Sequence, residues 1–353
     1  MKARSTIVVV IVAALLLPQI APGFETNQYD LPRQPLADIG YEVTDHVARK
    51  LRMAVEKVNR EIASREKCIA AGSDYHSLRD CGELGVERKR LEYLRSEDGV
   101  AQAAFDQLGA GVPPFTSMGT WMDSHRFVAQ PARYRTSYLK SIFILNAGVA
   151  LTISPTVKLY GSEFGTDKIA HVFQQGYTYY KLYRRALADG ATPTAAMAKA
   201  VRWGQKSERT FYGTLVAGVY SNGDLAANYA GLKFYQELTK PIATGESTRP
   251  AVLELHEGTW RFSSRSEELL LKPFISDHFN EALNPSIFSK LLGWRWFIRR
   301  SVRKRSCDQW RQRYPKLSRS SLDERSRGLQ LWHGEDYGFT DSEDFVTIAN
   351  TCF

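Results

Sequence analysis

Apolar residues recur at helical spacing along most of this 353-residue chain. The clearest case is the segment 41–68, where Val47, Leu51 and Val58 fall on one face of a helix. A second helix is predicted over 83–108, and with the first it makes an antiparallel helical pair within residues 24–110, an N-terminal unit built of helix against helix.

A Gly/Pro-rich stretch over 109–119 marks the best internal boundary. It leads into a central helical unit, residues 111–245. One helix there has a clear start, because a threonine and a proline at 192–193 supply a cap and a first helical residue. Ser221 or Asn222 caps the next helix.

Residues 246–353 form a mixed, basic C-terminal region. A strand or hairpin is predicted at 251–262 and a helix at 285–305, followed by a basic loop and an acidic, loop-rich tail. A further short strand is expected at 156–160. The predicted fold class is mainly α, with a helical bundle-like core, a loop-rich, disulfide-stapled C-terminal region and few short strands.

Residues 1–23 have the pattern of a signal peptide. Lys2 and Arg4 precede an apolar run over 7–17 that is too short for a comfortable membrane span, and small residues permit cleavage before Phe24. The alternative is an uncleaved N-terminal anchor. In both cases we expect an exported protein that is periplasmic or associated with the cell envelope.

The four cysteines all follow the predicted cleavage site, and an even number in an oxidising compartment favours two disulfides. Their order along the chain suggests Cys68 with Cys81 and Cys307 with Cys352, among three pairings. No C-x-x-C sequence is present, so the spacing does not indicate a zinc site.

The net charge of +9 is concentrated in one region. Between Arg295 and Arg327 there are twelve Lys and Arg residues and three acidic residues, so the rest of the chain has no net charge. Such a region can contact phosphates, lipid headgroups or another acidic partner.

The predicted helix 285–305 has one apolar face, with the basic residues mostly outside it, as in helices that lie on anionic membrane surfaces. The residues expected to make this contact are Trp294, Arg299, Arg300, Arg303, Lys304 and Arg305. An anionic membrane surface or another acidic envelope component is therefore the expected partner, and nucleic acid is a poor candidate for an exported protein. The alternative is a helix packed on the core with an arginine-rich solvent face.

A polar cluster is predicted in the central unit. Asp167 and His171 lie four residues apart at one helix start, and Asp224 and Asn228 repeat that spacing on a later helix, with Glu208 between them in sequence. Glycines at 176, 213 and 231 would let these helices approach closely. A buried cluster of this kind must be paired, metal-bound or catalytic.

Three interpretations of the cluster remain open. Asp167, His171, Glu208 and Asp224 could bind a divalent cation that activates water for hydrolysis. Without a metal, an aspartate could orient His171 as a general base while Lys168 or Arg209 stabilises developing negative charge. In the third interpretation, the cluster is a hydrogen-bonded network that fixes the packing of the helices. The sequence indicates no other cofactor.

The segments GTDKIAH (165–171) and SNGDLAAN (221–228) resemble the D-K-x-x-H … D-L-x-x-[ND] pattern of the VanZ-like proteins and of small bacterial lipoproteins. The resemblance covers roughly residues 154–235, and the chain departs from the VanZ-like pattern in lacking multiple membrane spans. The matched residues are Asp167, Lys168, His171, Asp224 and Asn228, with Glu208 a looser match. The resemblance implies an envelope location more than a particular reaction.

Two functions are consistent with this sequence. The first is a hydrolase-like enzyme that uses the polar cluster on an envelope component, which could be lipid-linked. The second is a non-catalytic envelope binding or scaffold protein whose cluster is structural. The common signatures G-x-S-x-G, H-E-x-x-H and the Walker loop are absent from the chain.

Overall fold

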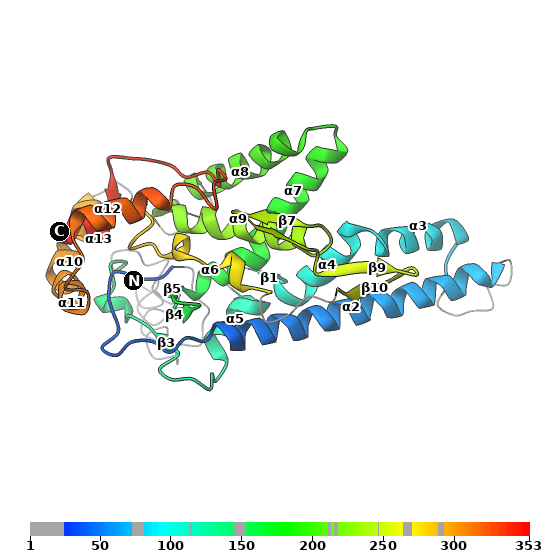
Figure 1. Cartoon of the computed structure of the whole chain (residues 1–353), viewed down its shortest axis with the longest axis horizontal. Coiled ribbons are helices and arrows are strands. Elements are labelled where there is room, and N and C mark those ends of the chain that lie inside the picture. Colours follow the sequence, from blue (N-terminus) through cyan, green and yellow to red (C-terminus); the bar gives the residue numbers. More distant parts are fainter. Residues whose placement is uncertain are drawn as a thin grey trace, which may run out of the picture.

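The structure is a computed structural model that describes residues 25–72, 81–112, 115–144, 153–210, 213–214, 218–245, 247–263, 270–288 and 293–353. The predicted signal peptide lies outside these residues. Helices dominate the described chain, and the strands are short and belong to small separate sheets (Figure 1). The predicted fold class, mainly α with few short strands, is confirmed.

The N-terminal unit contains the long helix α2 (Gly40–Ala70), which runs along one edge of the molecule with α3 (Leu84–Leu94) and α4 (Glu97–Leu108) beside it (Figure 1). The predicted single helix over 83–108 is wrong. It is two helices, because the Ser96 side chain accepts a hydrogen bond of 3.2 Å from the Gly99 amide and starts α4 anew.

The central unit contains an antiparallel sheet of β3 (Arg133–Tyr134), β4 (Thr156–Leu159) and β5 (Ser162–Gly165). A continuous helical segment follows, in which one π-helical turn separates two α-helical parts. Its parts are α6 (Thr166–Ala170), η4 (His171–Gln175) and α7 (Gly176–Ala188). The short strand predicted at 156–160 is thus confirmed.

Two further helices complete the central unit. The helix α8 (Pro193–Arg209) begins as predicted, with the Thr192 side chain accepting from the Ala195 amide, but it ends at Arg209, so Glu208 lies in its last turn. The helix α9 (Asn222–Glu237) is capped by Ser221, and 15 of its 16 residues are buried. Because α9 is enclosed almost completely, it is the centre around which α6, α7 and α8 pack.

The remaining short strands form hairpins and one small sheet. The predicted hairpin at 251–262 is confirmed as β9 and β10. The small sheet has the strand order β12-β11-β6. These strands are β1 (Gly111–Val112), β2 (Phe115–Thr116), β6 (Val219–Ser221), β7 (Ile242–Thr244), β8 (Ser247–Arg249), β9 (Leu253–His256), β10 (Thr259–Phe262), β11 (Ser286–Phe288) and β12 (Phe345–Val346). The short helix α5 (Ser117–Ser124) directly follows β2.

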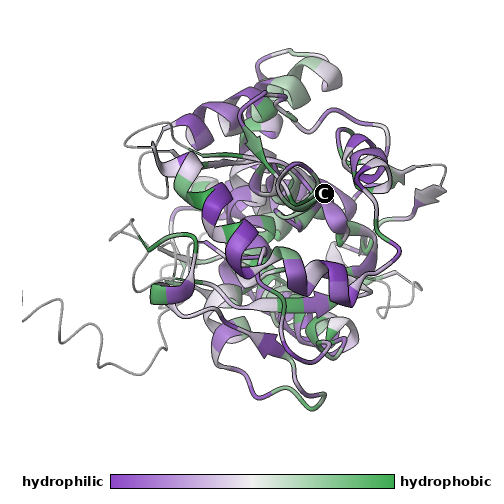
Figure 2. Cartoon of the chain, turned by 90° about the vertical axis from the view of Figure 1, so that its left-hand side faces the viewer, coloured by the Kyte–Doolittle hydropathy of each residue, from purple (hydrophilic) through white to green (hydrophobic). Residues whose placement is uncertain are grey.

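The C-terminal region is more helical than the sequence suggested. The predicted helix over 285–305 begins only at α10 (Trp294–Arg305), because residues 286–288 pair as β11 between β6 and β12. The stretch expected to be a basic loop is largely two helices, α11 (Cys307–Arg313) and α12 (Arg319–Gly328). The chain ends in α13 (Ile348–Cys352), and these helices form one end of the molecule (Figures 1 and 2).

The apolar interior has two main parts. The larger one joins α2 and α4 to the central helices and includes Val47, Phe173 and Phe234. The smaller one lies in the C-terminal region around Ile298 and Trp310. Among the helices that the structure describes, none is long and apolar enough to cross a membrane.

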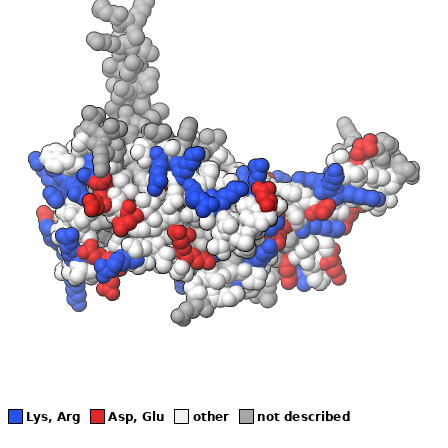
Figure 3. Space-filling model, turned by 90° about the horizontal axis from the view of Figure 1, so that it is seen from above, with Lys and Arg blue, Asp and Glu red and all other residues white. Residues whose placement is uncertain are grey.

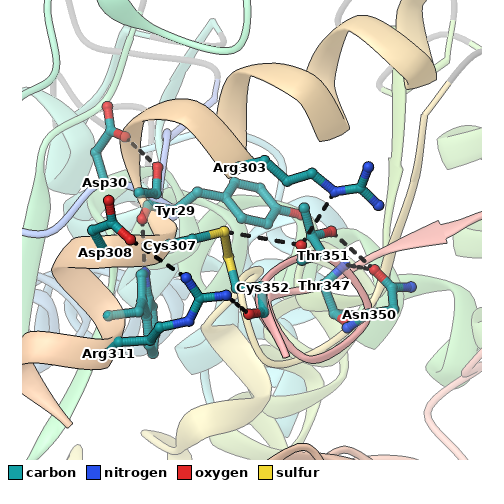
Figure 4. The surroundings of a disulfide bond; sticks show 12 residues. Tyr29, Asp30, Arg303, Cys307, Asp308, Arg311, Thr347, Asn350, Thr351 and Cys352 are labelled. Atoms are coloured by element: carbon teal, nitrogen blue, oxygen red, sulfur yellow. Dashed lines mark hydrogen bonds and ion pairs between the residues drawn. A yellow bond between two sulfur atoms is a disulfide. The ribbon is translucent and has the colours of Figure 1, made fainter. Parts of the chain in front are cut away.

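Both predicted disulfides are present. Cys68 and Cys81 have their Cα atoms 5.5 Å apart, and Cys307 and Cys352 have theirs 5.0 Å apart. The second bridge ties α13 to the start of α11 (Figure 4). Disulfides form and persist in oxidising compartments, so they indicate an exported protein.

The two disulfides should contribute unequally to stability. The cysteines are 45 residues apart in the Cys307–Cys352 bridge and 13 apart in the Cys68–Cys81 bridge. A longer closed loop restricts the unfolded chain more. We therefore expect replacement of Cys307 and Cys352 by alanine to lower the free energy of unfolding by about 4 kcal/mol, and replacement of Cys68 and Cys81 to lower it by about 3 kcal/mol. Urea unfolding of both double variants measures these losses, and a larger loss for the Cys68–Cys81 pair would contradict the expectation.

Candidate functional site

Two glycines set the closest approach of the central helices. Gly176 begins α7 and Gly231 lies in α9, and a Cβ atom added to Gly176 would lie 2.5 Å from the Cα atom of Gly231. A Cβ atom on Gly231 would overlap the carbonyl oxygen of Val172. Only glycine fits at this crossing, as the sequence predicted, and the crossing brings the polar start of α6 against the polar start of α9.

The ammonium group of Lys168 is at the centre of the resulting cluster. Its Nζ atom lies 2.5 Å from Asp167 Oδ2, 2.5 Å from Asp224 Oδ1 and 2.8 Å from Glu281 Oε1. The lysine side chain is 0% exposed, and the three carboxylates are nearly as buried. A charge in such surroundings requires this degree of pairing.

Segments far apart in the chain hold the carboxylates in place. Thr26 donates a hydrogen bond of 2.7 Å from Oγ1 to Asp167 Oδ1. Ser221 donates a bond of 2.7 Å to Glu281 Oε1 while its hydroxyl also accepts from the Asp224 amide. Gln28 accepts a hydrogen bond from the backbone amide of Glu281. The first described residues of the chain are therefore part of the wall of the cluster.

His171 lies at the edge of the cluster. Its Nδ1 atom is 2.9 Å from Asn228 Oδ1, to which it donates a hydrogen bond, and its Nε2 atom is 3.5 Å from Asp224 Oδ2. The side chain is 16% exposed. Both ring nitrogens thus face groups of the chain itself.

The charges within the cluster shift one another's proton affinity. Burial alone would lower the pKa of Lys168, but the nearby Asp167, Asp224 and Glu281 outweigh burial and raise it well above its usual value. Burial likewise acts to raise the pKa of Asp224, yet His171 and Lys168 hold it below its usual value. We infer that Lys168 is a permanent ammonium ion and Asp224 its ionised partner.

Three buried glutamates have raised pKa values, in contrast to Asp224. Burial, then Glu281 and Asp224, raise the pKa of Glu25 well above its usual value. Burial, then Asp224, raise that of Glu208 well above its usual value. Burial also raises the pKa of Glu281, more than Lys168 lowers it. Each of these glutamates therefore holds a proton more tightly than an exposed glutamate does, because it is buried and close to other carboxylates.

The sequence located part of this site. Asp167, Lys168, His171, Asp224 and Asn228 converge as predicted, and Glu208 lies in the same buried surroundings. Two acidic members, Glu25 and Glu281, were not predicted from the sequence. They come from segments without helical periodicity or a motif, so no spacing rule connects them to α6 or α9.

The metal-site interpretation of Asp167, His171, Glu208 and Asp224 is not supported. The ammonium of Lys168 already lies between the two aspartates, at the position that a cation would take. Throughout the described part of the chain, no group of three or more His, Cys, Asp and Glu side chains is arranged to hold a metal ion.

The basic C-terminal region makes many contacts within the protein. Arg299 donates to the carbonyl oxygen of Phe345, Arg303 to that of Thr351 and Arg305 to that of Lys140. Arg303 and Arg311 lie beside the second disulfide and donate to backbone carbonyls of the last residues (Figure 4). Trp294 is partly buried and packs against the smaller apolar core.

Arg300 and Lys304, which were also predicted to contact a membrane, are exposed on α10, and they share this surface with Trp296. Trp296 is 66% exposed, and the guanidinium of Arg300 lies 5.4 Å from its ring centroid. Lys304 is exposed on the same helix. Lys and Arg side chains gather at this end of the molecule, with acidic side chains among them (Figure 3).

A cavity of about 650 Å³ lies on another side of α9. It is lined by residues of α7, α8 and α9, by the segment 239–243 and by Glu335 and Asp336 of the C-terminal tail. The members of the buried cluster are not among its lining residues. The helix α9 therefore contributes Asp224 and Asn228 to the cluster and Tyr229 and Lys233 to the cavity.

Comparisons with known proteins give no match: no protein-family model fits the chain, and neither a curated protein nor a solved structure is similar to it. The resemblance to VanZ-like proteins stays a prediction. The geometry of the cluster and of the cavity is therefore the basis for the function proposed below.

Because the pKa of Glu208 is raised, this residue should make the folded protein less stable as the pH rises. The folded protein binds this proton more tightly than the unfolded chain, so the favourable contribution is complete below the ordinary pKa of 4.5 and is lost as the pH rises toward the folded pKa. Glu208→Gln keeps a neutral side chain of the same shape. We expect the variant to be more stable than wild type at pH 8, by at least about 1 kcal/mol, and equally stable at pH 4.

Urea unfolding of wild type and variant across this pH range measures the difference. The matched control is Glu343→Gln at an exposed position, where the difference from wild type should stay small at every pH. If the Glu208 variant gains no stability between pH 4 and pH 8, the carboxyl group is not held in a buried, acidic environment.

Proposed function

We propose that this is an exported, non-catalytic binding protein of the bacterial periplasm or envelope, whose polar cluster is architectural. The observation that carries the proposal is the separation of two sites by α9. The charged cluster is closed and internally paired, whereas the open space is a cavity lined by other residues.

The cluster lacks the features of a reaction centre. A general base must reach the proton that it removes, and a nucleophile must be accessible to the substrate. Here the nitrogens of His171 face Asn228 and Asp224, and Lys168 is enclosed by three carboxylates. These contacts instead join the first described residues, α6, α9 and the segment around Glu281 into one unit.

The cavity has the features of a ligand site. Small-molecule pockets have volumes of roughly 300–1,000 Å³ and combine apolar and aromatic walls with a few placed polar groups. The volume of about 650 Å³ is within this range, and Tyr180, Tyr183 and Tyr229 are among the lining residues. A binding role therefore places the ligand at this cavity.

Variants of the cluster test whether it is architectural. Asp224→Asn removes one of the partners of a fully buried ammonium ion, so we expect it to lower the free energy of unfolding by about 3–5 kcal/mol. His171→Ala removes a hydrogen bond to a buried amide and should lower it by about 1–2 kcal/mol. Thermal and urea unfolding of the purified variants measures both values.

The matched control is Asp189→Asn, because that aspartate is exposed and should change stability little. Catalytic groups are commonly replaceable without loss of stability. If Asp224→Asn and His171→Ala unfold like wild type, the architectural role is refuted and the hydrolase hypothesis is favoured instead.

A second proposal concerns the partner of α10, for which we propose an anionic membrane surface. It is supported by the exposed ring of Trp296, since tryptophan is enriched at membrane interfaces, and by the neighbouring cations Arg300 and Lys304. The other basic residues of α10 named above are already engaged by backbone carbonyls.

Cosedimentation with vesicles tests this surface. We expect wild type to bind vesicles that contain phosphatidylglycerol, with binding lost at high salt, and not to bind pure phosphatidylcholine. Arg300→Glu with Lys304→Glu should weaken binding by tenfold or more, at about 1 kcal/mol per charge removed. Lys89→Glu with Lys206→Glu makes the same change in net charge elsewhere on the surface, and an equal loss with this control would mean that only overall charge matters.

A further inference from the structure

We infer that the cavity between α7, α8 and α9 binds a sugar that carries a single acidic group, either a carboxylate or a phosphate. This inference rests on the proposed binding function and names the ligand class. The two helices α7 and α8 project side by side, with α9 next to them (Figure 1). The tail residues Glu335 and Asp336 close the cavity on a further side.

Tyrosine rings and aliphatic groups provide the apolar part of the lining. The hydroxyl of Tyr180 donates to Asp98 at 3.2 Å, and that of Tyr229 donates to Glu335 at 2.7 Å. Both rings are thereby fixed in position before a ligand arrives. Met197 and Val201 of α8 add aliphatic surface. Fixed aromatic rings are suited to the apolar face of a sugar ring, because they contribute contact area with little loss of side-chain entropy.

Most charged groups of the lining are already paired. Arg184 Nη1 lies 2.6 Å and Lys240 Nζ 2.9 Å from the carboxylate of Glu97. Lys233 Nζ lies 2.8 Å from Glu335 Oε1. Paired groups of this kind can still form hydrogen bonds with hydroxyl groups of a ligand, but their charges are already neutralised by their partners.

Arg202 is the exception among the basic residues of the lining. It is exposed on α8, lines the cavity, and within the described chain it has no hydrogen-bond or ion-pair partner. Asp336 of the lining also has no ion pair there and accepts a hydrogen bond from the Gly338 amide. The guanidinium of Arg202 is thus the one cation of the described lining whose charge is not neutralised by a carboxylate, because Arg184, Lys233 and Lys240 each have one. A guanidinium group binds carboxylate and phosphate groups through two parallel hydrogen bonds. Arg202 therefore predicts a ligand with one acidic group.

The neutral polar residues favour a polyhydroxylated ligand over a flat aromatic acid. Gln205, Gln236, Thr194 and Thr239 all line the cavity. Gln205 donates its amide to the carbonyl of Gly338 at 3.0 Å and keeps its amide oxygen for an acceptor role. Amide and hydroxyl groups distributed around a cavity match the hydroxyl groups of a sugar, whereas an aromatic acid would leave them unpaired.

Titration calorimetry of the full-length mature protein tests the inference. The probes are glucuronic acid, glucose 1-phosphate, glucose, inorganic phosphate and 4-hydroxybenzoate. We expect one or both acidic sugars to bind at least tenfold more tightly than the other three, and the stronger of the two identifies the acidic group. Arg202→Gln should weaken the acidic sugar by about tenfold, as for the loss of a charge-assisted hydrogen bond, and leave glucose unchanged.

Two further variants complete the design. Met197→Trp fills the cavity and should abolish binding, while Lys206→Gln, at an exposed position of the same helix, should leave it unchanged. Equal binding of phosphate or of 4-hydroxybenzoate would overturn the sugar assignment, as would no binding of either acidic sugar by folded wild-type protein. These failures are distinct from failure of the proposed function, which is decided by the stability of the Asp224 and His171 variants.

Discussion

The structure depends on one buried ammonium ion. Transfer of a charge from water into a protein interior is highly unfavourable, so Lys168 is tolerable only where several carboxylates surround it. Asp167, Asp224 and Glu281 do so from three different parts of the chain. The lysine thereby fixes the position of the α6 start against the α9 start, and both against the segment around Glu281. The same requirement orders the first described residues, because Thr26 holds Asp167 from the other side.

The helix α9 connects this cluster with the cavity. It is enclosed almost completely, and its polar residues divide between two surroundings. Asp224 and Asn228 face the closed cluster, whereas Tyr229 and Lys233 contribute to the cavity. Because α9 is a single rigid helix held at its start by Ser221 and Lys168, the cavity is preformed on a stable element. Preformed sites bind ligands with a smaller entropic penalty.

Helical spacing and the positions of glycines were sufficient to predict part of this structure from the sequence. The pairs Asp167–His171 and Asp224–Asn228 are visible because helix geometry places residues four apart on one face, and the glycines at 176 and 231 marked the close crossing. Glu281 could not be found in this way, since its position depends on tertiary packing of a segment without periodicity. The cavity was missed for the same reason: Lys233 and Glu335 are 102 residues apart in the sequence. The helix predicted over 285–305 is confirmed only from Trp294 onward, because the short segment 286–288 pairs as a strand and a short apolar stretch suits either structure.

In the basic C-terminal region, the net positive charge alone is a poor indicator of a binding surface. Its arginines were expected to face a partner, but Arg299, Arg303 and Arg311 donate to backbone carbonyls near the end of the chain. Carbonyl groups at the ends of short helices lack intrahelical partners, and long arginine side chains can satisfy them while the charge stays close to solvent. Part of the positive charge is therefore explained by folding of the region around the Cys307–Cys352 bridge. Arg300 and Lys304 on α10 and Arg202 at the cavity make no such backbone contacts within the described chain, and the binding surfaces proposed above therefore depend on these three cations.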